Sequence, residues 1–231
     1  MTSLLKWGRS ARTTIPVMAG YLVLGAGFGI LLRTRGFGLG WALAMSLFIY
    51  AGSMQYVAVD LLTGGASLLT AAVTTLLVNA RHLFYGISML ERYRAAGKYA
   101  PYLIFSLTDE TYSLVAAREE LTGAECFRIS LLDQFYWVLG TALGSLAGAY
   151  LNVNTTGIDF SLTALFLTVF TGQWLETKDH APALIGLGVS IVCRLLFGAD
   201  SFLLPTMAGM LFCLLVPVSY THLTLPTICS V

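Results

Sequence analysis

Long apolar runs dominate the chain, and each is close to the length that a membrane-crossing helix needs. Such a helix requires about 20 mostly apolar residues to cross the hydrocarbon core of a bilayer, with a range of about 17 to 25. Several apolar segments approach this length, and short polar connectors separate them. They cover residues 15–32, 39–62, 66–90, 99–117, 131–151, 160–175, 181–197 and 201–218. The pattern predicts a polytopic membrane protein with about seven or eight spans.

The apolar runs predict helices rather than β-strands. They lack the period-two alternation that a barrel strand needs between lipid and lumen. Small residues instead recur at four-residue spacing, which lets helix backbones approach closely in lipid. The first span contains Gly25 and Gly29, and the fifth contains Gly140, Gly144 and Gly148. We therefore predict an all-α transmembrane bundle. Breaks are expected in the second and third segments, at Gly52–Ser53, Gly64–Gly65 and Asn79.

The connectors between the apolar runs are too short to fold as separate domains. The sequence therefore predicts a single transmembrane domain over residues 13–218, preceded by a basic segment over residues 1–12. The last residues, 219–231, read SYTHLTLPTICSV and resemble a translated vector sequence. We expect this tail to be non-native and leave it out of the fold prediction.

Composition supports a membrane location and argues against several classes of partner. Hydrophobic residues make up 57% of the chain and charged residues 11%, whereas a soluble domain has about 25% charged residues. The formal net charge of +1 provides no basic field for nucleic acid. The expected surroundings are a lipid bilayer. The cysteines, Cys126, Cys193, Cys213 and Cys229, lack CxxC spacing, so neither a metal site nor a cofactor is predicted.

Ionisable residues near the middle of the third and fourth segments are the strongest signs of function. They are Arg81 and His82 in the third segment, and Asp109 and Glu110 in the fourth. Each charge at mid-depth costs about 2.5 to 3.5 kcal/mol on insertion scales. We expect these groups to face one another, a water-filled cavity or a ligand. Two interpretations stay open: an ion pair that only fixes helix register, or a static pair beside a second acid that carries a proton.

Neutral polar residues in the second segment suggest a place for substrate. Ser53, Met54, Gln55 and Tyr56 lie at depth, where amide and hydroxyl groups can hold a zwitterion and Met can contact an aliphatic tail. Hydrogen bonds between helices are an equally good explanation for the same residues.

Asp133 and Gln134 are expected at the first turn of the fifth span. An acid is favourable at a helix N-terminus, so we assign this pair a structural role.

Four blocks of the sequence resemble the AzlC family of branched-chain amino acid permeases. They are AGSMQYVAVDLLTGGAS at 51–67, TTLLVNARHLFYGIS at 74–88, SLTDETYSL at 106–114 and GIDFSLTALFLTVFTGQW at 157–174. The resemblance extends over about residues 10–217. It implies export of leucine, isoleucine, valine and sometimes methionine across a bacterial inner membrane, driven by the proton gradient. It also implies a partner, a small membrane subunit of the AzlD type.

The site residues follow from the matched motifs together with their chemistry. The predicted substrate-binding residues are Ser53, Met54, Gln55, Tyr56, Asn79 and Tyr85. The predicted proton-coupling or ion-pair residues are Asp109, Glu110, Arg81 and His82.

Three other functions remain as alternatives. The cargo can be another small neutral solute or an ion, or the chain can be a membrane assembly subunit that transports nothing. A membrane enzyme with His82 as base is the third alternative. The sequence has no GxSxG, HExxH or paired-aspartate motif to supply a nucleophile or metal beside that base. We therefore do not expect an enzyme.

Overall fold

The computed structural model describes the greater part of the chain. The described residues are 3–116, 118, 120–150, 160, 163–164, 167, 170–171, 174–175, 180–202, 205–206, 208–210 and 212–213. The tail 219–231 lies outside them, as does most of the expected segments 160–175 and 201–218. Contacts divide the chain into two compact units, Met1–Ala164 and Leu165–Val231. The single domain over 13–218 stays a prediction.

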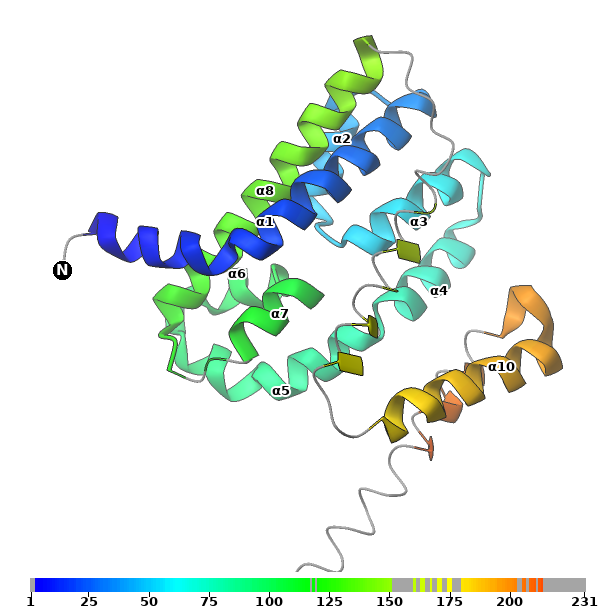
Figure 1. Ribbon diagram of the computed structural model, residues 1–231. Helices are drawn as coiled ribbons and strands as arrows, with labels where there is room; N and C mark the ends of the chain where they lie inside the picture. The colour runs from blue at the N-terminus through cyan, green and yellow to red at the C-terminus, as the bar shows by residue number, and fades with distance from the viewer. Residues whose placement is uncertain are drawn as a thin grey trace, which may run out of the picture. The chain divides into compact units, whose positions relative to one another are not determined.

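Every regular element in the described residues is helical, which confirms the all-α prediction (Figure 1). The first unit contains α1 (Ser3–Thr34), α2 (Leu39–Phe48), α3 (Gly52–Thr63), α4 (Leu68–Asn79), α5 (Arg81–Ala95), the 3-10 helix η1 (Gly97–Tyr99), α6 (Ala100–Phe105), α7 (Asp109–Ala116) and α8 (Gly123–Tyr150).

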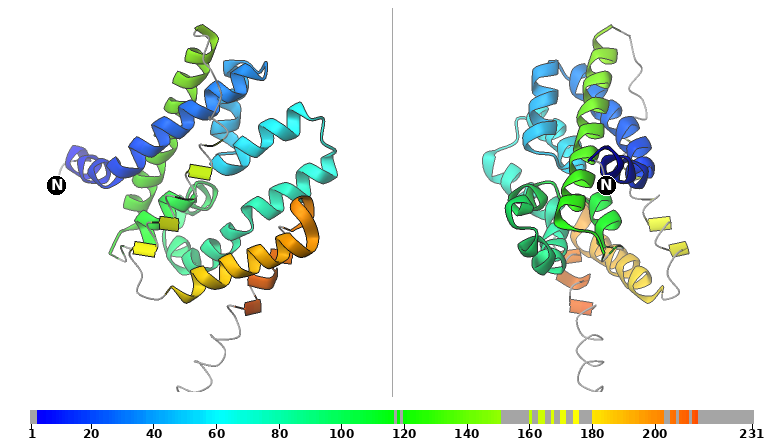
Figure 2. Two further views of the ribbon diagram at one scale, coloured as in Figure 1. Left: turned by 45° about the vertical axis from the view of Figure 1, so that its right-hand side comes forward. Right: turned by 90° about the vertical axis from the view of Figure 1, so that its left-hand side faces the viewer.

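The long helices α1 and α8 pack side by side and form the frame of the first unit (Figures 1 and 2). Their glycine ridges face each other. A methyl group added at Gly25 would lie 2.8 Å from the Trp137 carbonyl oxygen, and one at Gly140 would lie 2.7 Å from the Leu22 carbonyl oxygen. The predicted small-residue spacing therefore brings two backbones together as lipid-embedded helices require.

The second and third predicted segments are both broken, as expected. The second divides between α2 and α3 around Tyr50, whose φ of 45° is in the left-handed region that non-glycine residues rarely adopt. The third is interrupted for one residue, Ala80, between α4 and α5. The fourth also divides, between α6 and α7 at residues 106–108, a break that was not predicted.

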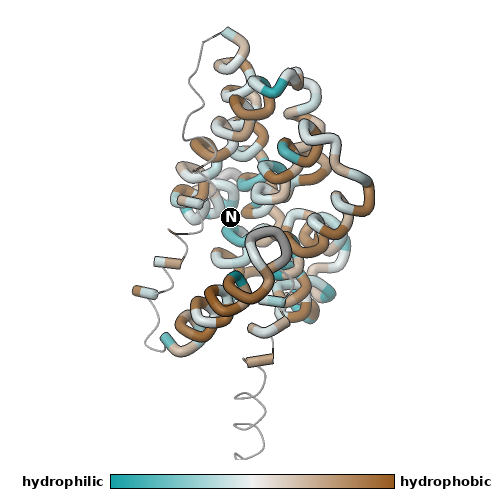
Figure 3. The backbone as a smooth tube through the Cα atoms, turned by 90° about the vertical axis from the view of Figure 1, so that its right-hand side faces the viewer, coloured by the Kyte–Doolittle hydropathy of each residue, from teal (hydrophilic) through white to brown (hydrophobic). Residues whose placement is uncertain are grey.

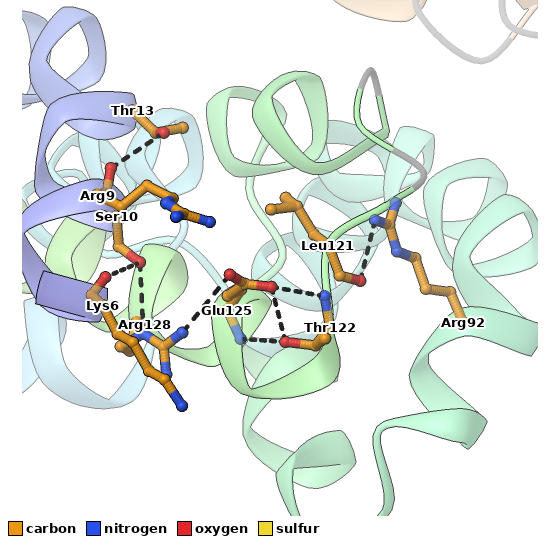
Figure 4. A network of polar contacts seen from close by, with 9 residues as sticks. All are labelled: Lys6, Arg9, Ser10, Thr13, Arg92, Leu121, Thr122, Glu125 and Arg128. Atoms are coloured by element: carbon orange, nitrogen blue, oxygen red, sulfur yellow. Dashed lines mark hydrogen bonds and ion pairs between the residues drawn. The ribbon is translucent and has the colours of Figure 1, made fainter. Parts of the chain in front are cut away.

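The helix α8 begins earlier than the predicted fifth span. Thr122 and Glu125 form a reciprocal cap: the Thr122 N–H donates to Glu125 Oε2 at 3.0 Å, and the Glu125 N–H donates to Thr122 Oγ1 at 3.4 Å (Figure 4). Arg128 then donates from Nε to Ser10 Oγ of α1 at 3.4 Å. The cap therefore determines where α8 starts, and the hydrogen bond from Arg128 joins the first turns of α8 to α1.

Arg92 of α5 holds the chain between α7 and α8. It donates to the carbonyl oxygen of Leu121 at 3.5 Å (Figure 4). It also donates to the carbonyl oxygen of Val115 at 2.6 Å and to that of Arg118. A guanidinium group is well suited to the unpaired carbonyls at the end of a helix.

Polar side chains lie inside the first unit while large apolar side chains lie on its surface. Gln55, Thr111 and Asp133 are fully buried, whereas Leu68 is 91% exposed and Phe48 78% exposed. Figure 3 shows apolar residues along most helices. A water-soluble protein avoids large exposed apolar patches. The interior also contains two clusters of buried apolar side chains. An apolar exterior around an interior of mixed polarity is typical of a helical membrane protein.

Two described helices are long and apolar enough to cross a membrane, judged by length and composition. They are Lys6–Thr34 in the first unit and Ala181–Gly198 in the second, and the shorter helices Leu39–Phe48 and Leu68–Asn79 are also apolar. The predicted number of spans, seven or eight, stays a prediction.

The described part of the second unit is built around α10 (Ala181–Ser201). Gly198 leaves the helical conformation with φ 76°, which a glycine adopts without strain. The guanidinium carbon of Arg194 lies 5.4 Å from the centre of the Phe202 ring, a cation–π distance.

Candidate functional site: an ion pair at broken helices

Arg81 and Asp109 form an ion pair where two broken helices begin. Arg81 is the first residue of α5 and Asp109 the first of α7. The Nη2 atom of Arg81 lies 2.7 Å from Oδ2 of Asp109, and it also donates to Ser53 Oγ in the first turn of α3 at 2.9 Å. Three segments that are far apart in sequence therefore meet at one guanidinium group, and the interruptions before α3, α5 and α7 make this meeting possible.

The ion pair is neither in open solvent nor sealed. The side chain of Arg81 is 29% exposed and that of Asp109 is 26% exposed, so each is partly accessible. An acid is favourable at the first turn of α7, whereas a cation at the first turn of α5 is not. Asp109 and Ser53 therefore compensate for the unfavourable position of Arg81.

Glu110 has different partners from its neighbour Asp109. Adjacent residues of a helix point about 100° apart, and Oε2 of Glu110 accepts a hydrogen bond from the Tyr21 hydroxyl at 2.8 Å. The Tyr21 oxygen also lies 2.6 Å from Oγ1 of Thr108, the residue before α7. One of the predicted acids is thus in the ion pair, while the other belongs to a hydroxyl network.

The hydroxyl network continues from Thr108 to Thr111, whose oxygens are 3.1 Å apart, and ends at Asp133, whose predicted position was wrong. It was expected at a helix N-terminus, but α8 begins at Gly123, so Asp133 lies well inside the helix. Its side chain is 0% exposed, and Oδ2 accepts a hydrogen bond from Thr111 at 2.8 Å. The predicted fifth span starts at residue 131, whereas the cap at Thr122 starts the helix eight residues earlier, at Gly123. The T-x-x-E pattern was the available signal.

Gln55 and Tyr56, predicted to bind substrate, make hydrogen bonds between helices. Gln55 is 0% exposed; its Nε2 donates to Ser46 Oγ at 3.2 Å, and its Oε1 accepts from Trp137 Nε1 at 3.0 Å. The Tyr56 hydroxyl donates to the Leu24 carbonyl at 2.7 Å. These positions match the second explanation, that of hydrogen bonds linking helices.

The remaining predicted residues lie around the ion pair. Met54 is buried beside Ser53. Asn79 and His82 flank Arg81 in sequence, and the Nδ1 atom of His82 lies 3.2 Å from the Asn79 carbonyl oxygen. Tyr85 stacks on Tyr112 of α7 with ring centres 4.3 Å apart.

An apolar groove opens next to the residues that flank Arg81. Its volume is about 680 Å³, and it is lined by segments of α4, α5 and α6. Asn79 and His82 contribute polar groups, while Leu83, Ile87 and Ile104 are among the apolar residues. The volume lies within the range of about 300 to 1,000 Å³ that is usual for small-molecule sites.

Within the described residues, no cluster of three or more His, Cys, Asp or Glu side chains is arranged to hold a metal ion.

The fold and the site define an α-helical membrane protein with a charged pair at interrupted helices. The family model for AzlC protein matches residues 16–151. The chain belongs to the AzlC family.

Relatives cover most of the chain. The branched-chain amino acid transport protein AzlC of Bacillus subtilis is 45% identical over 86% of this chain and 80% of its own length. An uncharacterized membrane protein of Helicobacter pylori is 41% identical over 87% of this chain and 90% of its own. Inner membrane protein YgaZ of Escherichia coli is 29% identical over 76% of this chain and 77% of its own. No solved structure matches the chain.

Proposed function

We propose that this chain transports branched-chain amino acids out of a bacterial cell, across the inner membrane, coupled to protons and together with a small AzlD-type subunit. Membership of the AzlC family and the name of the Bacillus subtilis relative support the substrate class. The observation that carries the proposal is the partly exposed Arg81–Asp109 pair at the start of two helices.

The ion pair has the charges that a zwitterion needs. The ammonium group of an amino acid replaces the guanidinium of Arg81 beside Asp109, and its carboxylate replaces Asp109 beside Arg81. Every charge keeps an opposite neighbour, so the desolvation cost of leaving a charge unpaired is avoided. The first turn of α3, next to Ser53, adds backbone N–H groups that have no partner within the helix and can hold the substrate carboxylate.

The apolar groove suits the aliphatic side chain. Because Asn79, Ala80 and His82 line it, the groove begins beside Arg81 in sequence. The groove is lined by sequence neighbours of Arg81 but not by Arg81 or Asp109 themselves. The proposal is that the side chain of a leucine, isoleucine or valine held at the ion pair extends into it. One methylene changes discrimination in such a site by about 1 to 3 kcal/mol, so selectivity among the three is expected to be weak.

Amino acid efflux tests the transport proposal. Cells that express the chain with its AzlD-type subunit are loaded with a leucine-containing dipeptide, and leucine release is followed with and without the proton gradient. Charge-assisted hydrogen bonds contribute about 1.5 to 3 kcal/mol, so Arg81→Gln and Asp109→Asn should each lower the rate at least about tenfold.

A second ion pair provides the matched control. Arg35 and Asp60 lie 3.9 Å apart on the surface, with side chains 44% and 75% exposed. Asp60→Asn removes a similar charge without touching the site and should leave efflux unchanged. If efflux requires the chain but persists in Asp109→Asn, the ion pair takes no part in transport. If no leucine is released at all, the proposed substrate is wrong.

A further inference from the structure

Two carboxyl groups in the first unit are joined by an unbroken row of hydroxyl groups. The row runs from Glu110 to Tyr21 at 2.8 Å, to Thr108 at 2.6 Å, to Thr111 at 3.1 Å and to Asp133 at 2.8 Å. All four distances lie within or close to the range for O–H···O hydrogen bonds. Tyr21, Thr108, Thr111 and Asp133 are buried, and Glu110 is partly buried.

The row contains more hydrogen bonds than its hydroxyl groups can supply. Each contact needs one proton between its two oxygens, and each hydroxyl donates one. Tyr21, Thr108 and Thr111 therefore supply protons for all but one of the contacts when both carboxyl groups are ionised. Without a further proton, one of the four contacts brings together two oxygens with no proton between them in a buried site. Where that contact is the one between Thr108 and Thr111, the backbone N–H of Thr111, which donates to Thr108 Oγ1 at 3.3 Å, offsets part of the cost.

A single proton on either carboxyl group satisfies every contact. We propose that Glu110 and Asp133 share one proton through Tyr21, Thr108 and Thr111, and that this is the proton site of the transporter. The proposal rests on the proposed function for its role in transport, but the count of protons does not depend on transport.

The shared proton can move by a concerted shift in which every hydroxyl group stays neutral and the negative charge passes from Asp133 to Glu110. When it starts on Glu110, that carboxyl donates to Tyr21, Tyr21 to Thr108, Thr108 to Thr111, and Thr111 to ionised Asp133. Each group passes its proton one step, and the row ends with Asp133 protonated, Glu110 ionised and every hydroxyl neutral. The reverse shift returns the first state.

Asp133 gives independent support for a site that takes up a proton. It is 0% exposed, and its second oxygen, Oδ1, is buried with no hydrogen-bond partner in the part of the chain that the structure describes. An ionised carboxylate held in this way is poorly compensated. A proton on the group removes the cost.

Among the described residues, Arg81 is the cation whose charge acts on Glu110, and it is already engaged. The titratable and charged groups that face the two acids from neighbouring elements are Tyr21, Tyr50, Tyr102, Asp109 and Arg81. Arg81 pairs with Asp109 at 2.7 Å. Because Thr108, Asp109 and Glu110 are consecutive, a substrate that binds Asp109 contacts the same turn that carries two members of the row. This connection gives the site a means of coupling proton and substrate.

Infrared spectroscopy of the purified protein with its AzlD-type subunit tests the shared proton directly. A protonated carboxyl group has a C=O stretching band distinct from that of a carboxylate. At neutral pH we expect a band of one protonated group in the wild type. Gln at 110 or Asn at 133 supplies an N–H donor in place of the proton, so Glu110→Gln and Asp133→Asn should each abolish the whole band. Asp60→Asn, at an exposed position, should leave it intact.

Three spectroscopic results would overturn the inference. Absence of the band in the wild type means that no proton is held. A band that falls by half in each single variant means two independent protons rather than one shared proton. A band that persists in Glu110→Gln but disappears in Asp133→Asn means a proton held by Asp133 alone.

The hydroxyl of Thr111 tests the path between the acids. Thr111→Ser keeps the hydroxyl and should retain proton-driven leucine flux, whereas Thr111→Val keeps the shape and should lower that flux at least about tenfold. Full proton-driven flux in Thr111→Val would overturn the path. Absence of leucine transport in the wild type would refute the proposed function, while the infrared result would still decide the shared proton.

Discussion

Arg81 and Asp109, the first residues of α5 and α7, are joined by an ion pair with 2.7 Å between Nη2 and Oδ2. Each charge is about one quarter exposed, so removing one leaves the other partly desolvated. We expect Arg81→Gln and Asp109→Asn each to destabilise the protein and the double variant to be more stable than the sum of the single effects predicts. A coupling energy of about 1 to 2 kcal/mol is expected. Thermal unfolding in detergent measures it, and strictly additive effects would contradict an energetic link between the two residues.

The contact between α1 and α8 leaves no room for a side chain at Gly140. A methyl group there would lie 2.7 Å from the carbonyl oxygen of Leu22, which is backbone and cannot move aside alone. Gly140→Ala should therefore lower stability by about 1 to 3 kcal/mol, as overpacking does. Gly20→Ala is the control, because no atom lies within 4 Å of an added methyl group. It should be neutral or slightly stabilising, since alanine favours helices. Equal effects of the two variants on the unfolding temperature would argue against this close approach.

Gln55 is expected to stabilise the fold rather than to bind substrate. Gln55→Met keeps the length of the side chain but leaves Trp137 Nε1 and Ser46 Oγ without their bonds to it. The expected loss of stability is about 1 to 3 kcal/mol, because buried polar groups lose their partners. The KM for leucine should not change in the folded fraction. Tyr56→Phe, which removes one hydrogen bond to a helix carbonyl, should cost less. A KM raised at unchanged stability would instead place Gln55 in the substrate site.

The cap of α8 predicts a pH dependence of stability. Hydrogen bonds from the N–H and then the hydroxyl of Thr122 lower the pKa of Glu125. A carboxyl whose pKa is lower in the folded state stabilises the protein above the unfolded pKa of about 4.3, and this stabilisation disappears as the pH falls through the folded value. Wild type should therefore unfold at a higher temperature than Glu125→Gln near neutral pH, and the gap should close in acid. A difference in unfolding temperature that does not vary with pH would show that the charge of Glu125 contributes nothing to stability.

The hydropathy pattern predicted the helical class and the breaks in the second and third segments because both depend on local signals. Length and composition identify apolar helices, and Gly52 and Asn79 lie directly next to the interruptions at Ala51 and Ala80. The break before Asp109 was not predicted. It has no glycine or proline at residues 106–108, and it depends on tertiary partners such as the Tyr21 hydroxyl beside Thr108.

The candidate site was predicted only in part. Arg81, Asp109 and Glu110 were predicted because the free-energy cost of inserting a charge into a membrane makes any charge in an apolar run a candidate functional residue. Asp133 was assigned to a helix end because the sequence does not show how deep a residue lies once the helix has begun. Tyr21 was missed altogether. Hydroxyl groups are common in membrane helices, and only the packing of α1 near Thr108 brings this one into the row.

Recognition of both charges of an amino acid by Arg81 and Asp109 is the central claim, and competition for leucine binding tests it most directly. Bound labelled leucine is displaced by leucine, by N-acetylleucine, which lacks the ammonium charge, and by leucinamide, which lacks the carboxylate. The two analogues should compete at least about tenfold more weakly than leucine, and Asp109→Asn should remove the discrimination against N-acetylleucine. Equal competition by all three in the wild type would contradict the claim.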